Sequence, residues 1–259
     1  MNHLRRKIIE LAYKAKEGHI ASSLSILDVL YVLYHDVLDI DSIFDMEHDR
    51  PRVILSKGHG ALGLYVVLNE AGLIPDEELE TYCQFNSPLG GHPRRDPGLG
   101  IEASTGSLGH GLPMAVGVAL GYKLRGYGSK VYCIIGDGES NEGSIWESVL
   151  LAVHHKLNNL VIIVDYNHSN DRALKYNSLW RQLAYFGLWV DEMDGHNHNW
   201  IERVLRPPDT DGRPICLIAN TIKGHGVKRM EEAPHAWHHT IPNETEYKEI
   251  MEELQCVSV

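Results

Sequence analysis

The sequence predicts an α/β fold in which helices cover both faces of a doubly wound, mostly parallel sheet. Short apolar runs of strand length alternate with helical patterns along the chain, and glycine-rich loops follow several of these runs. A length of 259 residues, 43% of them hydrophobic, is enough to bury one large core. Because no internal repeat and no linker interrupt this pattern, we expect a single domain over residues 1–259.

The first elements are helical. Helical periodicity covers residues 4–15, and a more thoroughly apolar helix is expected at 24–37, with His19 on the connection between them. A short strand at 52–55 is followed by a loop at 56–60 and a helix at 61–71. His59 therefore follows the end of a strand.

The middle of the chain contains a long loop and a helix of small residues. Residues 85–111 are rich in glycine and proline, and a loop of this length is uncommon unless it is functional or disordered. The helix expected at 113–124 contains alanines and glycines that would permit close packing against another element or another subunit. Further along we expect an element at 188–192, a helix near 200–205, a polar turn at 206–214, a strand at 215–220 and a terminal helix at 243–254.

A strand–helix–strand unit lies between these parts, with a buried strand at 130–135, a crossover helix at 144–157 and a second buried strand at 160–164. A right-handed crossover makes the two strands parallel, so the loops that follow them open at the same sheet edge. Asp137 and Asn167 follow these two strands. We therefore expect them to lie close together at the edge where open α/β sheets bind ligands.

These polar groups suit a magnesium ion that anchors a diphosphate. The Asp137 carboxylate, the Asn167 amide oxygen and a backbone carbonyl near Ser169 are the hard oxygen donors that Mg²⁺ or another divalent cation prefers. Gly138 would let the backbone approach a diphosphate, and its amide could donate a hydrogen bond to it. The alternative is that Gly136-Asp137-Gly138 is only a turn. A turn, however, needs no distant oxygen ligand such as Asn167.

Composition excludes several classes of function. A net charge of −11 argues against a general nucleic-acid-binding protein, which would need clustered lysine and arginine. The cysteines are dispersed and form no metal-binding or disulfide pattern: Cys83, Cys133, Cys216 and Cys256. No signal peptide and no apolar run of membrane-spanning length is expected, so we predict a cytoplasmic protein with reduced thiols and no membrane partner.

The segment from Gly136-Asp137-Gly138 to Asn167 resembles the thiamine-diphosphate motif of the transketolase family. Further motifs match in family order and span nearly the whole chain: Glu17-Gly18-His19, Ser56-Lys57-Gly58-His59-Gly60, Gly91-His92-Pro93, Thr105-Gly106-Ser107-Leu108-Gly109-His110-Gly111, Asp194-Gly195-His196 and Lys223-Gly224-His225-Gly226. The resemblance implies the diphosphate-binding module of an enzyme that transfers a two-carbon ketol unit from a ketose, phosphorylated or sulfonated, to an aldose. It implies thiamine diphosphate and Mg²⁺ as cofactors.

The resemblance also assigns roles to individual residues. The residues implied to bind the cofactor are His59, Gly106, Ser107, Leu108, Gly136, Asp137, Gly138, Glu139, Asn167 and His238. The residues implied to take part in catalysis are His19, His59, His92, His238 and Glu142, and those implied to hold the metal are Asp137, Asn167 and Ser169. Among these, His92 would contact the donor ketose. Such histidines suit proton transfer because imidazole titrates near neutral pH.

Two of these assignments keep an alternative. Glu142 matches an acid that connects paired active sites in the family, but an acid at a helix N-terminus is also favoured by the helix dipole. In Ala236-Trp237-His238-His239 the family usually has a glycine after the histidine, so His239 could occupy the position assigned to His238.

Departures from the family pattern point to a split enzyme. His19 is followed by Ile20-Ala21-Ser22-Ser23 in place of a proline-containing run, and His110 replaces a common glutamine, both of which resemble split transketolases. The glutamate that activates the cofactor belongs to a pyrimidine-binding domain, which we expect on a partner chain together with the C-terminal domain. The resemblance implies an α₂β₂ assembly, with this chain inactive alone. Alternatives are a deoxyxylulose-phosphate-synthase-like or 2-oxoacid-decarboxylating subunit, or a non-catalytic interaction protein.

Overall fold

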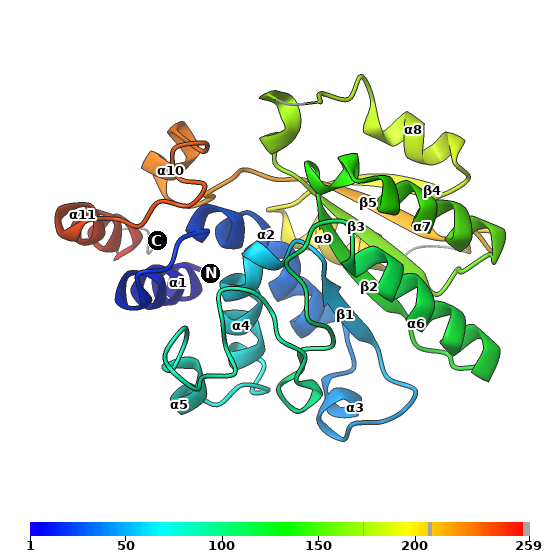
Figure 1. The fold of residues 1–259 in the computed structure, drawn as a ribbon, viewed down its shortest axis with the longest axis horizontal. Helices are drawn as coiled ribbons and strands as arrows, with labels where there is room; N and C mark the ends of the chain where they lie inside the picture. Colours follow the sequence, from blue (N-terminus) through cyan, green and yellow to red (C-terminus); the bar gives the residue numbers. More distant parts are fainter. Residues whose placement is uncertain (173, 207–208, 256–259) are drawn as a thin grey trace.

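The computed structural model describes residues 1–172, 174–206 and 209–255, and its centre is a five-stranded sheet (Figure 1). All neighbouring strands are parallel, in the order β1-β2-β3-β5-β4. The strands are β1 (Arg52–Leu55), β2 (Val131–Gly136), β3 (Leu160–Tyr166), β4 (Trp189–Asp194) and β5 (Ile215–Asn220).

Strands β2 and β3 form from continuous apolar runs because both of their faces are buried. Successive side chains of a strand point to opposite faces, so Tyr132 and Ile134 belong to one apolar cluster and Cys133 and Ile135 to the other. Gly136 of β2 pairs with Asp165 of β3. This register brings the ends of the two strands level, which places the loops that follow them side by side.

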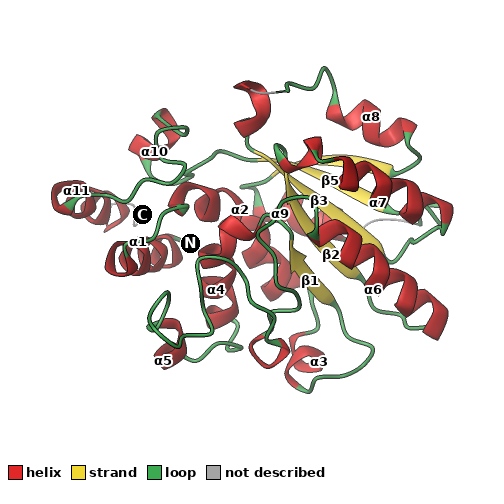
Figure 2. Cartoon of the chain, in the orientation of Figure 1, coloured by secondary structure: helices red, strands yellow, loops and turns green. Residues whose placement is uncertain are grey.

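Helices cover both faces of the sheet (Figure 2). On one face lie α2 (Ile20–Val32) and α9 (His198–Leu205). The helices α4 (Ala61–Glu70), α1 (Asn2–Ala15) and α11 (Glu244–Gln255) share the apolar cluster of that face, with α4 and α1 packed on α2 and α11 packed on α1. On the other face lie α6 (Gly111–Arg125), α7 (Gly143–His154) and α8 (Leu179–Tyr185). A right-handed connection that moves outward from β2 to β3 puts α7 on one face, whereas the connection that returns from β4 to β5 puts α9 on the other. The predicted fold class is confirmed.

Helix α2 is strongly apolar. Together with the π-helical turn Leu33–Val37 it forms an apolar helical stretch, Ile20–Val37, that is long enough to cross a membrane. In this fold, however, 78% of the stretch is buried inside the protein. It has the burial of a core helix.

Several boundaries differ from the sequence predictions. The helix expected from residue 24 begins at Ile20, and the crossover helix expected to reach 157 ends at His154. The irregular loop at 85–111 is present and contains a 3₁₀ turn at Pro97–Leu99. Residues 207 and 208 of the polar turn expected at 206–214 are outside the described residues, and so is Cys256.

Short helices between the main elements were missed by the sequence analysis: α3 (Ile40–Phe44), α5 (Asp76–Leu79), α8 and α10 (Lys228–Glu232). A capping signal marks the start of α8, because the Ser178 hydroxyl accepts a hydrogen bond from the Arg181 amide at 3.3 Å.

Candidate functional site

The carboxyl ends of β1, β2, β3 and β5 meet around a cavity of about 110 Å³. The residues that line it are Ser22, Lys57, His59, Leu108, Gly136, Asp137, Gly138, Glu139, Asn167, Ser169, Lys223 and His238. The cavity therefore unites segments from the whole length of the chain. It includes the three residues that the sequence analysis proposed for the metal, Asp137, Asn167 and Ser169.

Asp137 stands at the end of β2 and is 2% exposed. One of its carboxylate oxygens accepts the Gly138 amide at 2.7 Å, and the other accepts the Asn170 amide at 3.2 Å. Burial raises the pKa of Asp137, the Asn170 amide opposes this, and the neighbouring Asp165 carboxylate raises the pKa further. A cation beside Asp137 would offset the cost of keeping this carboxylate charged.

Asn167 is oriented by groups from three elements. Its Nδ2 donates to Ser25 Oγ on α2 and to Asp165 Oδ2 on β3, both at 3.0 Å. Its Oδ1 accepts the Ser169 amide at 3.2 Å and the Ser169 hydroxyl at 2.5 Å. The amide group is thereby fixed with its nitrogen toward the core and its oxygen toward Ser169.

A buried ion pair lies beneath this site. Lys57, 1% exposed, pairs with Asp165, which is fully buried. Asp165 also accepts hydrogen bonds from the hydroxyls of Ser25 and Thr221. Since Asp165 holds both Lys57 and Asn167, it links the end of β1 to that of β3. The sequence analysis assigned neither Lys57 nor Asp165, although Lys57 stands in a quoted motif.

Lys223 is a second lysine that the sequence analysis left without a role. It is 4% exposed, and its Nζ donates to Ser169 Oγ at 3.0 Å and to His238 Nδ1 at 2.8 Å. Burial and the charge of Lys57 lower the pKa of Lys223 to about 8. The signal that could have found it is the glycine-rich segment that follows β5, because such segments bring backbone and side chain close to phosphates.

Glu139 is 2% exposed and fully used by the protein itself. Its Oε1 accepts the Ser56 hydroxyl and, at 2.9 Å, the Gly109 amide, while its Oε2 accepts the Gly136 amide at 3.1 Å. The carboxylate thus joins the loops after β1 and β2 to the loop before α6. This geometry favours a structural task over the direct cofactor contact implied by the resemblance.

Two glycines shape the smaller cavity: Gly58 lets two loops approach closely, and Gly138 leaves space for a ligand. A Cβ added to Gly58 would lie 2.7 Å from the Gly106 amide nitrogen, so these two loops approach as closely as backbones can. At Gly138, by contrast, an added Cβ would meet nothing within 4 Å, and its backbone is in the ordinary helical region (φ −66°). The space above Gly138 is therefore free for a ligand.

His19 and four neighbouring histidines form a cluster beside the cavity. The ring centroid of His19 lies 5.4 Å from those of His59 and His238, 6.0 Å from that of His92 and 4.5 Å from that of His239. Burial lowers the pKa of His19 to about 4 with the help of its histidine neighbours, and lowers that of His59 to about 2 together with Lys57. Both rings are therefore neutral at pH 7.

His238 and His239 face different partners. His238 lines the cavity and accepts the hydrogen bond from Lys223, whereas His239 Nε2 lies 3.5 Å from Glu17 Oε1. The structure thus turns His238 toward the predicted cofactor site.

The remaining predicted residues lie at the rim or outside the cavity. His92 is exposed, and its ring stands over Gly106, where an added Cβ would lie 2.9 Å away. Ser107 is exposed, while its neighbour Leu108 lines the cavity. Glu142 is exposed at the N-terminus of α7, against Gly109, and it does not line the cavity.

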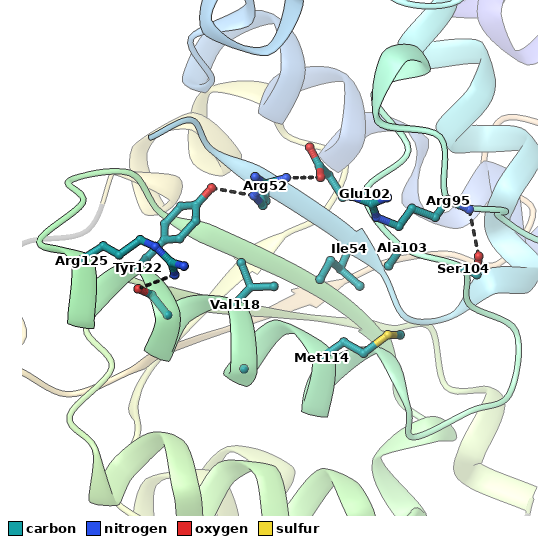
Figure 3. A pocket seen from close by; sticks show the side chains of 12 residues that line it. Arg52, Ile54, Arg95, Glu102, Ala103, Ser104, Met114, Val118, Tyr122 and Arg125 are labelled. Atoms are coloured by element: carbon teal, nitrogen blue, oxygen red, sulfur yellow. Dashed lines mark hydrogen bonds and ion pairs between the residues drawn. The ribbon is translucent and has the colours of Figure 1, made fainter. Parts of the chain in front are cut away.

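A larger cavity of about 690 Å³ lies between β1, α6 and the segment at 102–104 (Figure 3). Arg52 sits in its wall between Tyr122 and Glu102, and donates to the Tyr122 hydroxyl at 2.6 Å. Met114 and Val118 form an apolar side of it on α6. No residue predicted to bind the metal or the diphosphate lines this larger cavity, so we do not assign the cofactor to it.

The donor set at the smaller cavity fits a divalent cation with a diphosphate. A carboxylate, an amide oxygen and a hydroxyl converge there beside an ammonium group and the open space at Gly138. Hard oxygen donors suit Mg²⁺, and Lys223 would neutralise part of a diphosphate charge.

Comparisons with known proteins show the family of the chain. The family model described as "Transketolase, thiamine diphosphate binding domain" matches residues 1–255. An apulose-4-phosphate transketolase subunit from Actinobacillus succinogenes is 40% identical over 97% of this chain and 93% of its own length. The 6-deoxy-6-sulfo-D-fructose transketolase subunit of a Clostridium species is 36% identical, over 98% of this chain and 94% of its own.

Solved structures show the same fold within longer chains. The crystal structure of the transketolase from Campylobacter jejuni superposes with a TM-score of 0.87 at 28% identity, over 98% of this chain. The present chain covers 42% of that transketolase chain.

Proposed function

Because the chain belongs to the transketolase family, we propose that it is the diphosphate-binding subunit of a split, thiamine-diphosphate-dependent ketol transferase. The observation that carries this proposal is the convergence of Asp137, Asn167, Lys223 and His59 on one cavity at the sheet edge. A turn after β2 would not by itself need these groups, which come from the ends of four strands.

In this proposal the metal is a divalent cation such as Mg²⁺, held by Asp137, Asn167 and Ser169. The Asp165 carboxylate keeps Asn167 turned the right way. Lys223 and the open backbone at Gly138 receive the diphosphate. When bound, thiamine diphosphate supplies the electron sink that cleavage of a ketose beside its carbonyl requires.

The histidine cluster handles protons and sugar hydroxyls. His19 and His59 are neutral at pH 7, so each offers a sugar hydroxyl one N–H donor and one acceptor nitrogen. His238 is held by Lys223 at the inner side of the cluster, while the exposed His92 stands at the mouth, where a donor sugar would enter. We propose that Glu142, which faces outward, acts at a contact between subunits.

A partner chain completes the site. The relatives that this chain matches over nearly their full length are named as transketolase subunits, and the solved transketolases are more than twice as long. We infer that the partner carries the pyrimidine-binding and C-terminal domains, in an α₂β₂ assembly. We propose that the partner contacts the larger cavity beside α6, the groove on α6, because Met114 is exposed there and a Cβ added at Gly117 would meet nothing within 4 Å (Figure 3).

The donor class follows from two of the relatives. One is named for apulose 4-phosphate and the other for 6-deoxy-6-sulfo-D-fructose, and both of these sugars carry an anion at one end. We propose a ketose with a terminal phosphate or sulfonate as the donor and an aldose as the acceptor. A cytoplasmic location fits the three free cysteines of the described residues.

The test is ketol transfer by this chain alone and by the complex it forms with its partner from native extract. The assay supplies thiamine diphosphate and Mg²⁺, with a panel of ketose phosphates and sulfonates and with pyruvate as a competing donor. We expect turnover by the complex only, with anionic ketoses.

Other outcomes would change the conclusion. Turnover with pyruvate alone would move the assignment to a decarboxylating or deoxyxylulose-phosphate-forming enzyme. Binding of a partner without any turnover would favour an interaction protein, and turnover by the lone chain would mean that the activating carboxylate lies in this chain.

A further inference from the structure

A second polar cluster is buried behind the site, against the face of the sheet that α2 covers. Its centre is Asp28 on α2, which is 2% exposed. One carboxylate oxygen accepts Arg5 Nη2 at 2.9 Å and lies 3.1 Å from His196 Nδ1, and the other lies 2.9 Å from His198 Nε2. Burial alone would raise the pKa of Asp28, but His196 and Arg5 outweigh it and lower the pKa to about 2.

The hydrogen bonds of His196 define its protonation. Its Nε2 lies 2.9 Å from the backbone nitrogen of Ile222, whose N–H can only donate. Nε2 therefore carries no proton, and the neutral ring has its proton on Nδ1, where it donates to Asp28. Asp28 thus selects the one tautomer that can accept the Ile222 amide.

Ile222 belongs to the segment 221–226, which carries Lys223 into the cavity. The Asp28 cluster holds this segment from behind at several points. The His225 ring stacks on that of His196, with centroids 3.6 Å apart, and Arg5 Nε donates to the His225 carbonyl at 3.2 Å. Gly226 has φ +88°, and an added Cβ there would lie 2.5 Å from the Arg5 side chain.

A metal ion is the competing explanation for such a cluster, because ligand atoms of Asp28, His196 and His225 lie within 4.8 Å of one another. Both nitrogens of His196, however, are already engaged, one by Asp28 and one by Ile222. A cation could take either nitrogen only by breaking one of these contacts. His196 therefore has no nitrogen free for a metal ion.

We propose that Asp28 and His196 are positioning residues that fix the segment 221–226 and thereby hold the Lys223 ammonium group against Ser169 and His238. The polar chain runs from Asp28 through His196 to the Ile222 amide, one residue before Lys223. The proposal rests on the proposed function only in naming a diphosphate as the group that Lys223 meets.

The test compares two histidines that both bond to Asp28, of which only His196 also reaches the segment 221–226. In His196→Leu the segment loses its acceptor, whereas His198→Leu loses a bond to the same carboxylate and leaves the segment alone. His196→Gln restores one donor and one acceptor. Amide hydrogen exchange of residues 222–226 and labelling of Lys223 by an amine-reactive reagent are measured on the full chain.

We expect His196→Leu to speed exchange of the Ile222 amide by about tenfold or more, the size of one lost hydrogen bond, and to make Lys223 label faster at pH 7. His198→Leu should leave both readouts unchanged, and His196→Gln should recover most of the protection. Asp28→Asn, in which the ring is free to adopt the other tautomer, should resemble His196→Leu at Ile222.

Equal exchange in His196→Leu and His198→Leu would overturn the proposal, as would faster exchange spread evenly over the whole chain. Binding of magnesium pyrophosphate by the complex with the partner is measured in parallel. We expect it to weaken about fivefold to twentyfold in His196→Leu. If the unsubstituted complex binds no magnesium pyrophosphate, the proposed function fails, while the exchange and labelling results still decide the positioning role.

Discussion

Nζ of Lys223 lies 2.8 Å from Nδ1 of His238, and this contact joins the phosphate-facing side of the site to the histidine cluster. Lys223 reaches it from the segment after β5, and His238 from the irregular segment between α10 and α11. A charge bound at Lys223 therefore acts directly on the imidazole that stands nearest to it. A substitution of either Lys223 or His238 is therefore expected to affect the other residue as well.

The first prediction concerns the open space at Gly138. Gly138→Ala should leave the melting temperature unchanged or slightly raised, because φ is already helical and the methyl group meets nothing. It should weaken thiamine-diphosphate binding by about tenfold or more, because the methyl fills the approach to the diphosphate. Gly143→Ala, which also meets nothing and lies outside the cavity, is the control. Unchanged binding in Gly138→Ala would place the diphosphate elsewhere.

The second prediction tests whether the negative charge of Asp137 is needed to bind the metal. Asp137→Asn should abolish the Mg²⁺ dependence of cofactor binding, measured by calorimetry with and without Mg²⁺, because the amide cannot supply an anionic ligand. The melting temperature should also fall, because the new NH₂ group faces the backbone N–H of Gly138 or Asn170. Asp171→Asn, in the loop after β3, is the matched control. Retained Mg²⁺ dependence would remove Asp137 from the metal site.

Glu139 should contribute to stability and not to metal binding. In Glu139→Gln one acceptor oxygen becomes an NH₂ group that faces a backbone N–H, at Gly136 or Gly109. We expect the free energy of unfolding to fall by about 1–3 kcal/mol, the cost of an unsatisfied buried donor. Chemical denaturation of the free chain measures this. A variant with full stability and lost cofactor binding would instead restore Glu139 as a direct ligand.

Acid should lower the stability of the folded protein, because the buried histidines resist protonation. His59 and His19 have folded pKa values of about 2 and about 4, below the ordinary 6.5, so below pH 6.5 the unfolded chain binds protons that the folded chain does not. Stability is therefore complete above pH 6.5 and is lost as the pH falls toward these values, by at most about 1.4 kcal/mol per pH unit for each histidine. Denaturant titrations from pH 7.5 to 5 should show a shallower decline in His59→Phe. An identical slope would show that His59 does not bear this cost.

The groove on α6 offers a test of assembly. Gly117→Arg should leave the free chain folded, because Gly117 is exposed and an added Cβ meets nothing within 4 Å, but it should block the groove and weaken association with the partner by about a hundredfold. Sedimentation of the mixed chains measures the association. The control is Lys248→Arg, on the opposite side of the fold in α11. Normal assembly of Gly117→Arg would mean that the partner binds another face.

The proximity of Asp137 and Asn167 was predictable because it needs only one local rule. The two follow neighbouring parallel strands, and the hydrophobic runs show where those strands end. The Lys57–Asp165 pair was not predictable in this way, since its partners are 108 residues apart, and Lys57 follows β1 while Asp165 lies in β3, two strands that do not pair with each other. The family resemblance implied a cofactor contact for Glu139, but only the structure shows that loops from three parts of the chain use its carboxylate. The short helix α8 was missed because a helix of one or two turns shows little hydrophobic periodicity.

The stretch Ile20–Val37 also has a consequence for biosynthesis. Ser25 in this stretch bonds to Asp165, 140 residues later in the chain. At a synthesis rate of roughly 5–20 residues per second, an interval of roughly 7–28 s separates the emergence of the two residues from the ribosome. During most of that interval this apolar helix has no paired strands to cover, because β2, the partner of β1, ends only at Gly136. The nascent chain thus resembles a client for chaperones that shield apolar segments, and it stays so until β3 is made.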